Sequence, residues 1–327
     1  MNGARHTLVI PVLNEDQVLR ELHRRLLAAL TGPLVAQGES WEVLFVNDGS
    51  FDRSEELLRA LREEDPAHVR VVSFSRNFGH EAAITAGLDR AGGDTVITMD
   101  ADLQDPPEVV LEMIARWREG FDVVYATRSE RPSETFFKKA TASLYYRLLR
   151  ASSEIEIPLD TGDFRLMSRR AVIALTALRE KHRLLRGMAR WVGFKQTSVS
   201  YVRHARHAGE TKFSVRRMAH LAWDGLASFS LLPLRLATLA GAGAAVAGAL
   251  MAGGVLAARI VQGPPLHRTA ALIAVLLVLG GAQLLALGIL GEYVGRLFEE
   301  IKRRPLYIVD YTLGLSEGDE RSAAPPS

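Results

Sequence analysis

The sequence predicts an α/β protein with a mainly parallel sheet, followed by a strongly apolar region. Two observations predict this class: residues 1–210 alternate short apolar runs with amphipathic stretches, and two long uncharged segments follow them. Alternation of strands with helices is typical of a parallel sheet covered by helices on both faces. The 48% hydrophobic and 24% charged fractions exclude a disordered or collagen-like chain.

Five apolar runs rich in β-branched or aromatic residues are the predicted strands, at 7–11, 41–46, 69–74, 95–99 and 122–126. The predicted helices lie between them, at 16–30, 54–62, 81–90 and 108–118. Ligands of such sheets bind where loops leave the carboxyl ends of the strands. Those loops are therefore the first place to look for functional residues.

The overall composition excludes several functions. Forty Lys and Arg against 38 Asp and Glu give a net charge of only +2, which argues against a nucleic-acid binder with a large basic surface. The chain has no cysteine, which excludes disulfides, cysteine-ligated zinc and a thiol nucleophile. It also lacks a P-loop and a dinucleotide-binding glycine fingerprint after the first strand, so an NTPase and a dinucleotide oxidoreductase are disfavoured.

Three acidic loops follow predicted strands: PVLNE (11–15), NDGSFDRS (47–54) and MDADLQDPPE (99–108). They would repel one another at one sheet edge unless a cation joined them, and carboxylates suit Mg²⁺ or Mn²⁺ bound to a diphosphate. Asp48 has the simpler alternative of a turn residue. His80 and Glu81 begin a helix, and we expect them to be structural rather than catalytic.

The two apolar segments, 236–258 and 269–291, are each long enough to cross a bilayer as a helix. A pair of helices buried in a large soluble core is the alternative. Basic residues flank the pair on both outer sides, which predicts a transmembrane hairpin with both termini and the α/β domain cytoplasmic. The expected localisation is therefore the inner membrane, as a multi-pass protein.

Before this hairpin, residues 211–235 mix apolar side chains with Arg and His, as in a helix lying at a membrane interface. An ordinary packing helix is the alternative. Four arginines in or near this segment are expected contacts for anionic lipid: Arg203, Arg206, Arg216 and Arg217.

Six motifs occur in order: VIPVLNE (9–15), VNDGS (46–50), SRNFGHEAAITAGL (75–88), MDADLQDPPE (99–108), GDFRLMSR (162–169) and RGMARWVGF (186–194). Together they resemble the polyprenyl-phosphate glycosyltransferases of family 2, which include bacterial undecaprenyl-phosphate glucosyltransferases and dolichyl-phosphate mannose synthases. The resemblance covers residues 5–310 and implies a GT-A, Rossmann-like catalytic fold. It implies four regions: a GT-A domain at 1–210, an interface segment at 211–235, the hairpin at 236–291, and a cytoplasmic tail at 292–327, disordered at its end.

The resemblance implies inverting, metal-dependent transfer of one sugar to undecaprenyl phosphate at the cytoplasmic membrane face. The first choice for the sugar is glucose, supplied by UDP-glucose. The lipid product would serve as a sugar donor for cell-envelope glycans. Its implied partners are the nucleotide sugar, the polyprenyl phosphate and the membrane, with Mg²⁺ or Mn²⁺ as cofactor and no nucleic acid. It is also compatible with a homo-oligomer.

Carried over by position, the resemblance implies the following site. The nucleotide-sugar residues would be Pro11, Leu13, Glu15, Val46, Asp48, Asp100, Ala101, Gln104, Arg128, Arg206 and Lys212. The metal ligands would be Asp102, Gln104 and Asp100, and the acceptor phosphate and lipid would meet Arg203, Arg206, Lys212, Arg216 and Arg217. Leu13 stands where relatives often have an aromatic residue, which leaves the preferred base open.

The implied catalytic residues are Asp163, Asp160 and Asp102. The acceptor phosphate is itself a largely anionic nucleophile at neutral pH, because its second pKa is about 6. Asp160 and Asp163 therefore remain alternatives as a base or as orienting groups. Arg165 is a candidate ion-pair partner of Asp163.

Three other functions stay open. A mannose synthase would use GDP-mannose in place of UDP-glucose. A processive polysaccharide synthase would need a Gln where Gly187 stands, and more spans than a hairpin. A non-catalytic membrane scaffold has no physical reason to keep the mutually repelling Asp48, Asp100 and Asp102.

Overall fold

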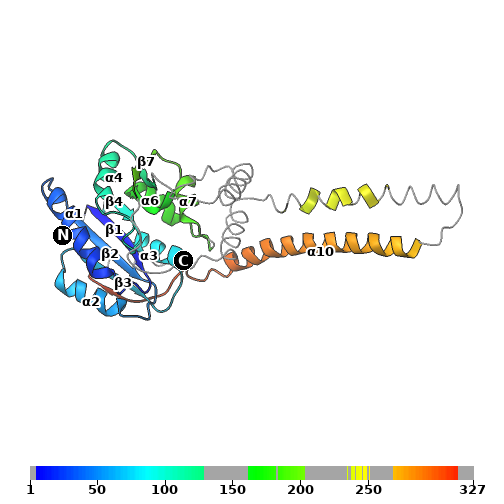
Figure 1. The fold of residues 1–327 in the computed structure, drawn as a ribbon, viewed down its shortest axis with the longest axis horizontal. Helices are drawn as coiled ribbons and strands as arrows, with labels where there is room; N and C mark the ends of the chain where they lie inside the picture. The colour runs from blue at the N-terminus through cyan, green and yellow to red at the C-terminus, as the bar shows by residue number, and fades with distance from the viewer. Residues whose placement is uncertain are drawn as a thin grey trace. The chain divides into compact units, whose positions relative to one another are not determined.

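The computed structural model describes residues 5–128, 161–181, 183–202 and 268–315, with scattered residues between 234 and 250. Figure 1 shows the arrangement of its elements. The strands are β1 (His6–Val12), β2 (Trp41–Asn47), β3 (Val69–Phe74), β4 (Thr95–Thr98), β5 (Val123–Arg128), β6 (Thr161–Ser168), β7 (Gln196–Tyr201) and β8 (Val309–Leu313). The helices are α1 (Leu19–Val35), α2 (Ser54–Glu64), α3 (His80–Arg90), α4 (Val109–Arg118), α6 (Arg169–Ala177), α7 (Leu185–Trp191) and α10 (Arg268–Ile301).

The described strands form one mixed sheet in the order β7-β5-β6-β4-β1-β2-β3-β8. Strands β4, β1, β2 and β3 pair in parallel, as do β5 and β7. Strand β6 is antiparallel to both of its neighbours, and β8 is antiparallel to β3. The predicted α/β class is therefore confirmed, with a mixed sheet rather than a mainly parallel one.

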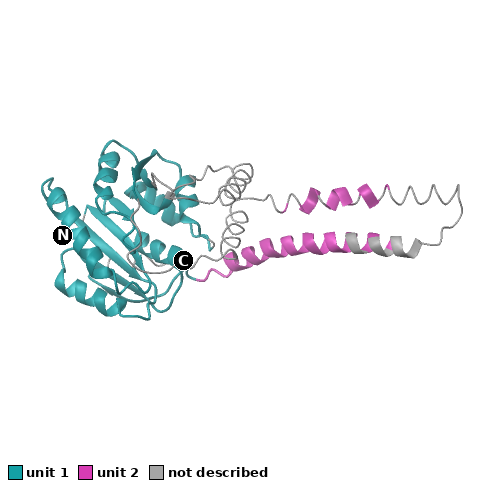
Figure 2. Cartoon of the chain, in the orientation of Figure 1, with its two compact units in different colours: residues 1–143, 155–212, 305–327 teal, residues 144–154, 213–304 magenta. Residues whose placement is uncertain are grey.

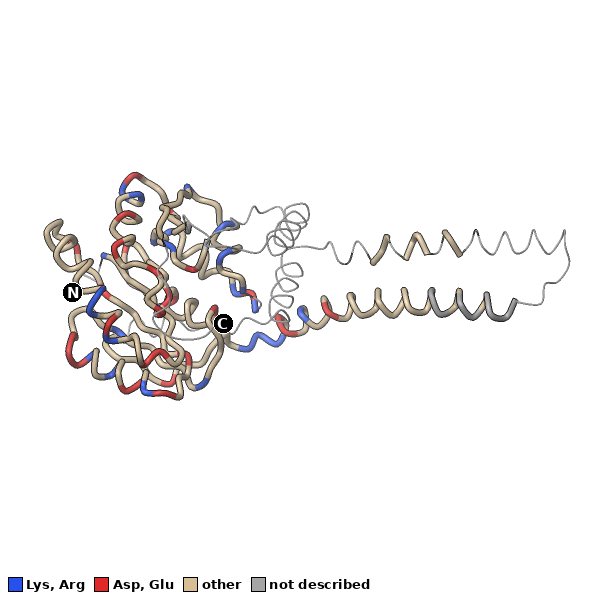
Figure 3. Tube along the Cα trace, viewed as in Figure 1, with Lys and Arg blue, Asp and Glu red and all other residues tan. Residues whose placement is uncertain are grey.

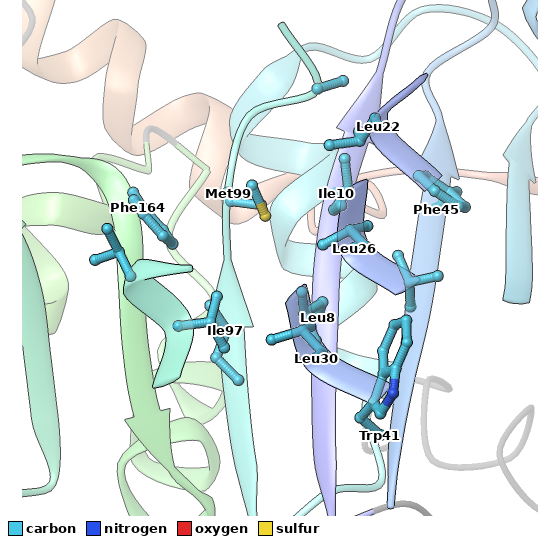
Figure 4. Close-up of a cluster of buried hydrophobic side chains, with 14 of the residues drawn as sticks. Leu8, Ile10, Leu22, Leu26, Leu30, Trp41, Phe45, Ile97, Met99 and Phe164 are labelled. Carbon is cyan, nitrogen blue, oxygen red and sulfur yellow. The ribbon is translucent and has the colours of Figure 1, made fainter. Parts of the chain in front are cut away.

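One face of the sheet carries the main hydrophobic core, shown in Figure 4. Because strand side chains alternate between faces, Leu8 and Ile10 of β1 point to the same side. They pack there against the apolar stripe of α1, formed by Leu22, Leu26 and Leu30. Helices α2 and α4 add their buried Leu, Val, Met and Ile residues to this core.

Helix α3 packs on the opposite face, over β1 and β2. Its close approach depends on Gly87, because a Cβ at that position would lie 2.1 Å from Cγ1 of the buried Val9. The contact fixes the height of α3 above the sheet. It thereby fixes the position of the first turn of α3, which begins at His80 beside the ends of the parallel strands.

Strand β8 completes the sheet beyond β3, in a region where the sequence analysis expected only a tail. Tyr307, just before β8, stacks on Phe74 with ring centroids 5.1 Å apart, and its hydroxyl donates to Asp89 Oδ2 at 2.7 Å. Arg90 Nη1 donates to the Tyr307 hydroxyl at 2.9 Å. The segment after α10 is therefore bound to β3 and to the C-terminal end of α3.

The chain divides into two compact units, shown in Figure 2. The first comprises residues 1–143, 155–212 and 305–327 and holds the sheet; the second comprises 144–154 and 213–304. The second unit is thus an insertion in the sequence of the first. The predicted boundary at residue 210 remains an expectation.

The predicted transmembrane hairpin requires correction. The first span, 236–258, lies largely outside the described residues, as does the predicted interface segment at 211–235. The second span lies within α10, which continues past Gly291 into a stretch with Glu292, Arg296 and Glu299 (Figure 3). Among the described residues, no helix combines the length and apolar character needed to cross a bilayer. The hairpin is therefore unsupported, and the predicted multi-pass inner-membrane localisation is wrong.

Candidate active site

The loops after β1 and β2 are joined side by side at the carboxyl edge of the sheet. The Asn14 amide donates to Ser50 Oγ at 3.0 Å, and the Phe51 amide returns a bond to Asn14 Oδ1 at 3.0 Å. The Glu15 amide donates to Ser54 Oγ at 2.8 Å. Asn14 has a positive φ of 58°, a conformation that Asn tolerates better than most residues. The two loops therefore form one surface.

Asp48 ties this surface to the loop before α3. It is buried, and its Oδ1 accepts from the Phe78 amide at 2.7 Å while Oδ2 accepts from the Gly79 amide at 3.0 Å. Burial raises the pKa of Asp48, although the two backbone hydrogen bonds oppose that shift. Gly49 makes the close approach feasible, because its φ is 66° and a Cβ there would lie 2.5 Å from the Arg76 carbonyl carbon.

The structure places the other predicted nucleotide-site residues along this edge. Pro11 and Val46 are buried register partners on β1 and β2. Leu13 is 41% exposed and Glu15 is half-buried in the next loop. Ala101 is buried after β4. The predicted base and ribose residues therefore share one edge, at the ends of β1, β2 and β4.

Asp100, Asp102 and Gln104 follow β4 and form the predicted metal site. Asp102 Oδ1 accepts from the Gln104 amide at 3.1 Å, which fixes the turn. The buried Oε1 of Gln104 has no hydrogen-bond partner among the described residues. Burial raises the pKa of Asp100 to about 6, and repulsion by Asp105, Asp163 and Asp102 acts in the same direction.

This donor set fits a divalent cation that a ligand helps to hold. Carboxylate and amide oxygens are the ligands that Mg²⁺ and Mn²⁺ prefer, and an oxygen without a partner suits such a role. Across the described ranges, no three His, Cys, Asp or Glu side chains are grouped so as to hold a metal ion by themselves. A cation bound here would need further oxygens, such as those of a diphosphate.

Asp163 of β6 lies next to this loop and is surrounded by cations. Arg165 Nη2 donates to its Oδ1 at 2.9 Å, so the predicted ion pair is confirmed. His80 Nε2 lies 3.3 Å from Asp163 Oδ2, and Arg186 Nη2 lies 3.6 Å from the same oxygen. His80 Nε2 also lies 3.7 Å from Asp100 Oδ1, so His80 bridges the two carboxylates.

The cluster has a clear electrostatic consequence. Burial alone would raise the pKa of Asp163, but the hydrogen bond from His80 and the charges of Arg165 and Arg186 hold it well below the ordinary aspartate value. Burial would lower the pKa of His80, but Asp163 and Asp100 raise it to about 9. Asp163 is thus a carboxylate stabilised in its ionised form, which makes it a weak proton acceptor.

Several predicted residues cannot be placed. The backbone of Arg128 ends β5, but its side chain is not described. The others lie outside the described residues: Asp160, Arg203, Arg206, Lys212, Arg216 and Arg217.

Sequence reasoning missed Arg186 altogether and assigned His80 only a structural role. Their proximity to Asp163 depends on β6, which inserts antiparallel beside β4 and is not one of the predicted strands. The register pairs Thr98 with Arg165, so Asp163 lies just beyond the end of β4, beside Asp100. An alternating pattern at 161–168, with Phe164 and Leu166 on one face and Asp163 and Arg165 on the other, was the available signal.

The chain is similar to known proteins along most of its length. The model of Glycosyl transferase family 2 matches residues 7–176. The chain is 48% identical over 310 residues to an uncharacterized glycosyltransferase, YkcC, of Bacillus subtilis, covering 95% of this chain and 94% of that protein. It is 40% identical to the SfII prophage-derived bactoprenol glucosyl transferase of Shigella flexneri, covering 93% of this chain and 96% of the other.

A prophage bactoprenol glucosyl transferase homolog of Escherichia coli is 39% identical over 305 residues, covering 93% of this chain and 97% of that protein. The mixed sheet and the loops at its carboxyl edge agree with the expected GT-A, Rossmann-like architecture. From the family match and from the extent of these identities, the chain belongs to glycosyl transferase family 2 and is a glycosyltransferase.

Proposed function

We propose that this glycosyltransferase transfers one glucosyl residue from UDP-glucose to undecaprenyl phosphate. The observation that carries the proposal is the similarity to proteins named bactoprenol glucosyl transferase, at 40% identity across 93% of the chain. The product would be a polyprenyl-phosphate sugar, a donor for cell-envelope glycans. Similarity over nearly the full length supports a shared acceptor class as well as a shared fold.

The nucleotide would lie on the surface made by the loops after β1 and β2. Leu13 is exposed there, and the hydrogen bonds between Asn14, Ser50 and Phe51 hold the two loops in place. Asp48 would act mainly by positioning, because its carboxylate accepts the Phe78 and Gly79 amides. The diphosphate would follow toward the loop after β4, where Asp100 and Asp102 lie.

We propose Asp102, Gln104 and Asp100 as the residues that would hold Mg²⁺ or Mn²⁺. A bound cation would supply charge neutralisation for the departing diphosphate. The support is that two carboxylates share this loop with Gln104, whose buried Oε1 has no hydrogen-bond partner in the described part of the structure. These residues would orient the diphosphate so that its bond to the sugar faces β6.

The reaction would invert the anomeric carbon by direct displacement. An oxygen of the acceptor phosphate forms the new bond to that carbon, and the bond to the diphosphate oxygen breaks with its electron pair leaving on the nucleotide. The phosphate is already largely anionic at pH 7, so removal of a proton contributes little. The three cations around Asp163 support a positioning role for this carboxylate, in place of the base role considered for Asp163 and Asp160.

The decisive experiment is a donor screen on the purified full chain with undecaprenyl phosphate in mixed micelles. Labelled UDP-glucose and GDP-mannose are supplied in parallel with Mg²⁺ or Mn²⁺, and EDTA and Asp102→Asn serve as controls. We expect label from UDP-glucose in a mild-acid-labile lipid, lost with EDTA and reduced by Asp102→Asn.

Each other outcome selects another function. Label from GDP-mannose alone would indicate a mannose synthase, and label in long insoluble polymer would indicate a processive synthase. A folded protein that gives no product from either donor would contradict the proposal.

A further inference from the structure

Two arginines contact Asp163, but they differ in what else they bind. Arg165 is fully buried, and its terminal nitrogens donate to Leu185 O at 3.0 Å, Gly162 O at 3.2 Å and Asp163 Oδ1 at 2.9 Å. These protein acceptors occupy its terminal nitrogens. Arg165 therefore stabilises the local structure by joining β6 to the start of α7.

Arg186 is arranged differently. Its Nε is buried without a hydrogen-bond partner among the described residues, while the side chain as a whole is 36% exposed. Its Nη2 lies 3.6 Å from Asp163 Oδ2, which is an ion pair but too long for a hydrogen bond. A buried donor without a partner costs about 1–3 kcal/mol, so an incoming acceptor atom would be stabilised here.

The backbone just before Arg186 is held from both sides. The Leu185 amide donates to Glu81 Oε2 at 3.3 Å, and the Leu185 carbonyl accepts from Arg165. Helix α7 therefore starts at a defined place beside the first turn of α3. Arg186 presents its guanidinium from a fixed backbone, which reduces the entropy lost when it binds a ligand.

The strand order places Arg186 on one side of the site. Strand β4 lies between β1 and β6, so the loops after β1 and β2 are on one side of the β4 loop and Asp163 is on the other. Arg186 contacts Asp163, away from the loops proposed for the nucleoside. Proceeding along the edge, the nucleoside, the diphosphate and then the nucleophile would follow in that order.

Resting on the function proposed above, we propose that Arg186 binds the phosphate of the polyprenyl phosphate acceptor and orients it toward the sugar. A guanidinium donates two parallel hydrogen bonds to a phosphate, which gives direction as well as charge neutralisation. Asp163 would keep its bond to Arg165 when the phosphate takes up the donors of Arg186, whose Nε has no partner within the described part of the chain. The donor diphosphate has the same chemistry, so the test separates the two phosphates.

The test compares Arg186→Met and Arg186→Lys with the control Arg190→Met. Arg190 lies on the same helix, but its Nη1 donates to Gln196 Oε1 at 3.0 Å, at the start of β7. The KM values for undecaprenyl phosphate and for UDP-glucose are measured separately. Calorimetric titration with farnesyl phosphate adds a reading that does not depend on turnover, and thermal unfolding reports on folding.

For Arg186→Met we expect about a tenfold to hundredfold rise in the acceptor KM and in the Kd for farnesyl phosphate, the effect of losing a charge-assisted hydrogen bond. The KM for UDP-glucose should stay near the wild-type value. Arg186→Lys keeps the charge but cannot donate two parallel hydrogen bonds. Its affinity for the acceptor should therefore lie between those of the wild type and Arg186→Met. Arg190→Met should leave both KM values unchanged.

Four results would overturn the inference. An acceptor KM that stays at the wild-type value in folded Arg186→Met contradicts it while the proposed function stands. A rise in the UDP-glucose KM alone would assign Arg186 to the donor. A wild-type protein that neither binds farnesyl phosphate nor makes lipid product removes the proposed function and this inference together. If Arg186→Met does not fold, an unchanged acceptor affinity in Arg186→Lys overturns the inference.

Discussion

The carboxylate of Asp48 accepts the amide of Gly79 at 3.0 Å, and so joins the end of β2 to the start of α3. The Phe78 amide donates to the same carboxylate at 2.7 Å. Because α3 begins with His80, which contacts Asp163 and Asp100, the carboxylate of Asp48 positions a charged group that it does not touch directly.

Asp48→Ala should therefore reduce both stability and activity. Two half-buried amides lose their acceptor, which predicts a loss of about 2–6 kcal/mol in the free energy of unfolding, at about 1–3 kcal/mol for each group. Chemical denaturation and the rate of sugar transfer measure the two effects. Asp94→Ala is the matched control, since the Asp94 side chain is 68% exposed. Equal stability in the two variants would contradict the role given to Asp48.

Gly87→Ala should destabilise the protein, although alanine favours helix. The added methyl would meet Val9 Cγ1 at 2.1 Å, and overpacking of this kind costs about 1–3 kcal/mol. Adding Val9→Ala should recover part of the loss, because the new methyl fills the space that is vacated. Gly92→Ala is the control, since no atom lies within 4 Å of its Cβ position. Thermal unfolding of Gly87→Ala, Val9→Ala, the double variant and Gly92→Ala checks this, and additive losses in the double variant would refute the contact.

Tyr307→Phe should cost more stability than Tyr311→Phe. The first change removes a hydroxyl that bonds both Asp89 and Arg90 and keeps the stacking on Phe74. The Tyr311 hydroxyl donates to Glu55 at 3.0 Å, and the Glu55 side chain is 42% exposed. Losing the bonds to Asp89, whose side chain is 2% exposed, and to the buried Arg90 should cost about 1.5–3 kcal/mol, against less than about 1 kcal/mol for the bond to the more exposed Glu55. Urea denaturation compares the stability of the two variants. A larger loss for Tyr311→Phe would be evidence that Tyr307 does not hold the segment after α10 to α3.

His6 is buried as a neutral ring, so the stability that it contributes should be lost as the pH drops below about 6.5. Burial lowers the pKa of His6 relative to the unfolded chain, so acid protonates the unfolded state first and favours it. Glu39 acts in the same direction at lower pH, because the hydrogen bonds from His6 and Arg118 outweigh burial and lower its pKa.

The difference between the wild type and His6→Gln in the slope of the unfolding free energy between pH 5 and pH 7 measures this contribution. Asp100 and His80, whose pKa values are raised to about 6 and about 9, change the slope in the opposite direction in both proteins. Trp117 is a local fluorescent probe, since its ring lies perpendicular to the His6 ring with the two centroids 5.9 Å apart. In His6→Gln the slope should be smaller than in the wild type. An unchanged slope would assign the acid sensitivity to other groups.

The sequence was sufficient for elements whose pattern is local. Strand β3 has the predicted bounds of 69–74, and the predicted helix at 81–90 begins one residue earlier, at His80. Strands β6, β7 and β8 were missed, because each depends on partners distant in the chain. The apolar alternation of β6 is short, and nothing local shows that it enters antiparallel beside β4.

The candidate site divides in the same way. Asp48, Asp100 and Asp102 were predictable, since each follows a strand with a local signature. Arg186 and His80 were not, because their contacts with Asp163 exist only once α3, β6 and α7 have come together. Charge and spacing in the sequence identify functional residues that follow a single strand. Contacts between residues of different elements can be predicted only when the pairing register of the strands is known.

The pairing of β3 with β8 has a consequence for synthesis on the ribosome. Val72 pairs with Thr312, so β3 has no strand partner on this side until β8 has been synthesised. Proteins emerge at about 5–20 residues per second, and an unpaired edge is a template for association with other chains. The nascent sheet therefore exposes β3 while the whole inserted unit is being translated, which is the interval in which a chaperone would be most useful.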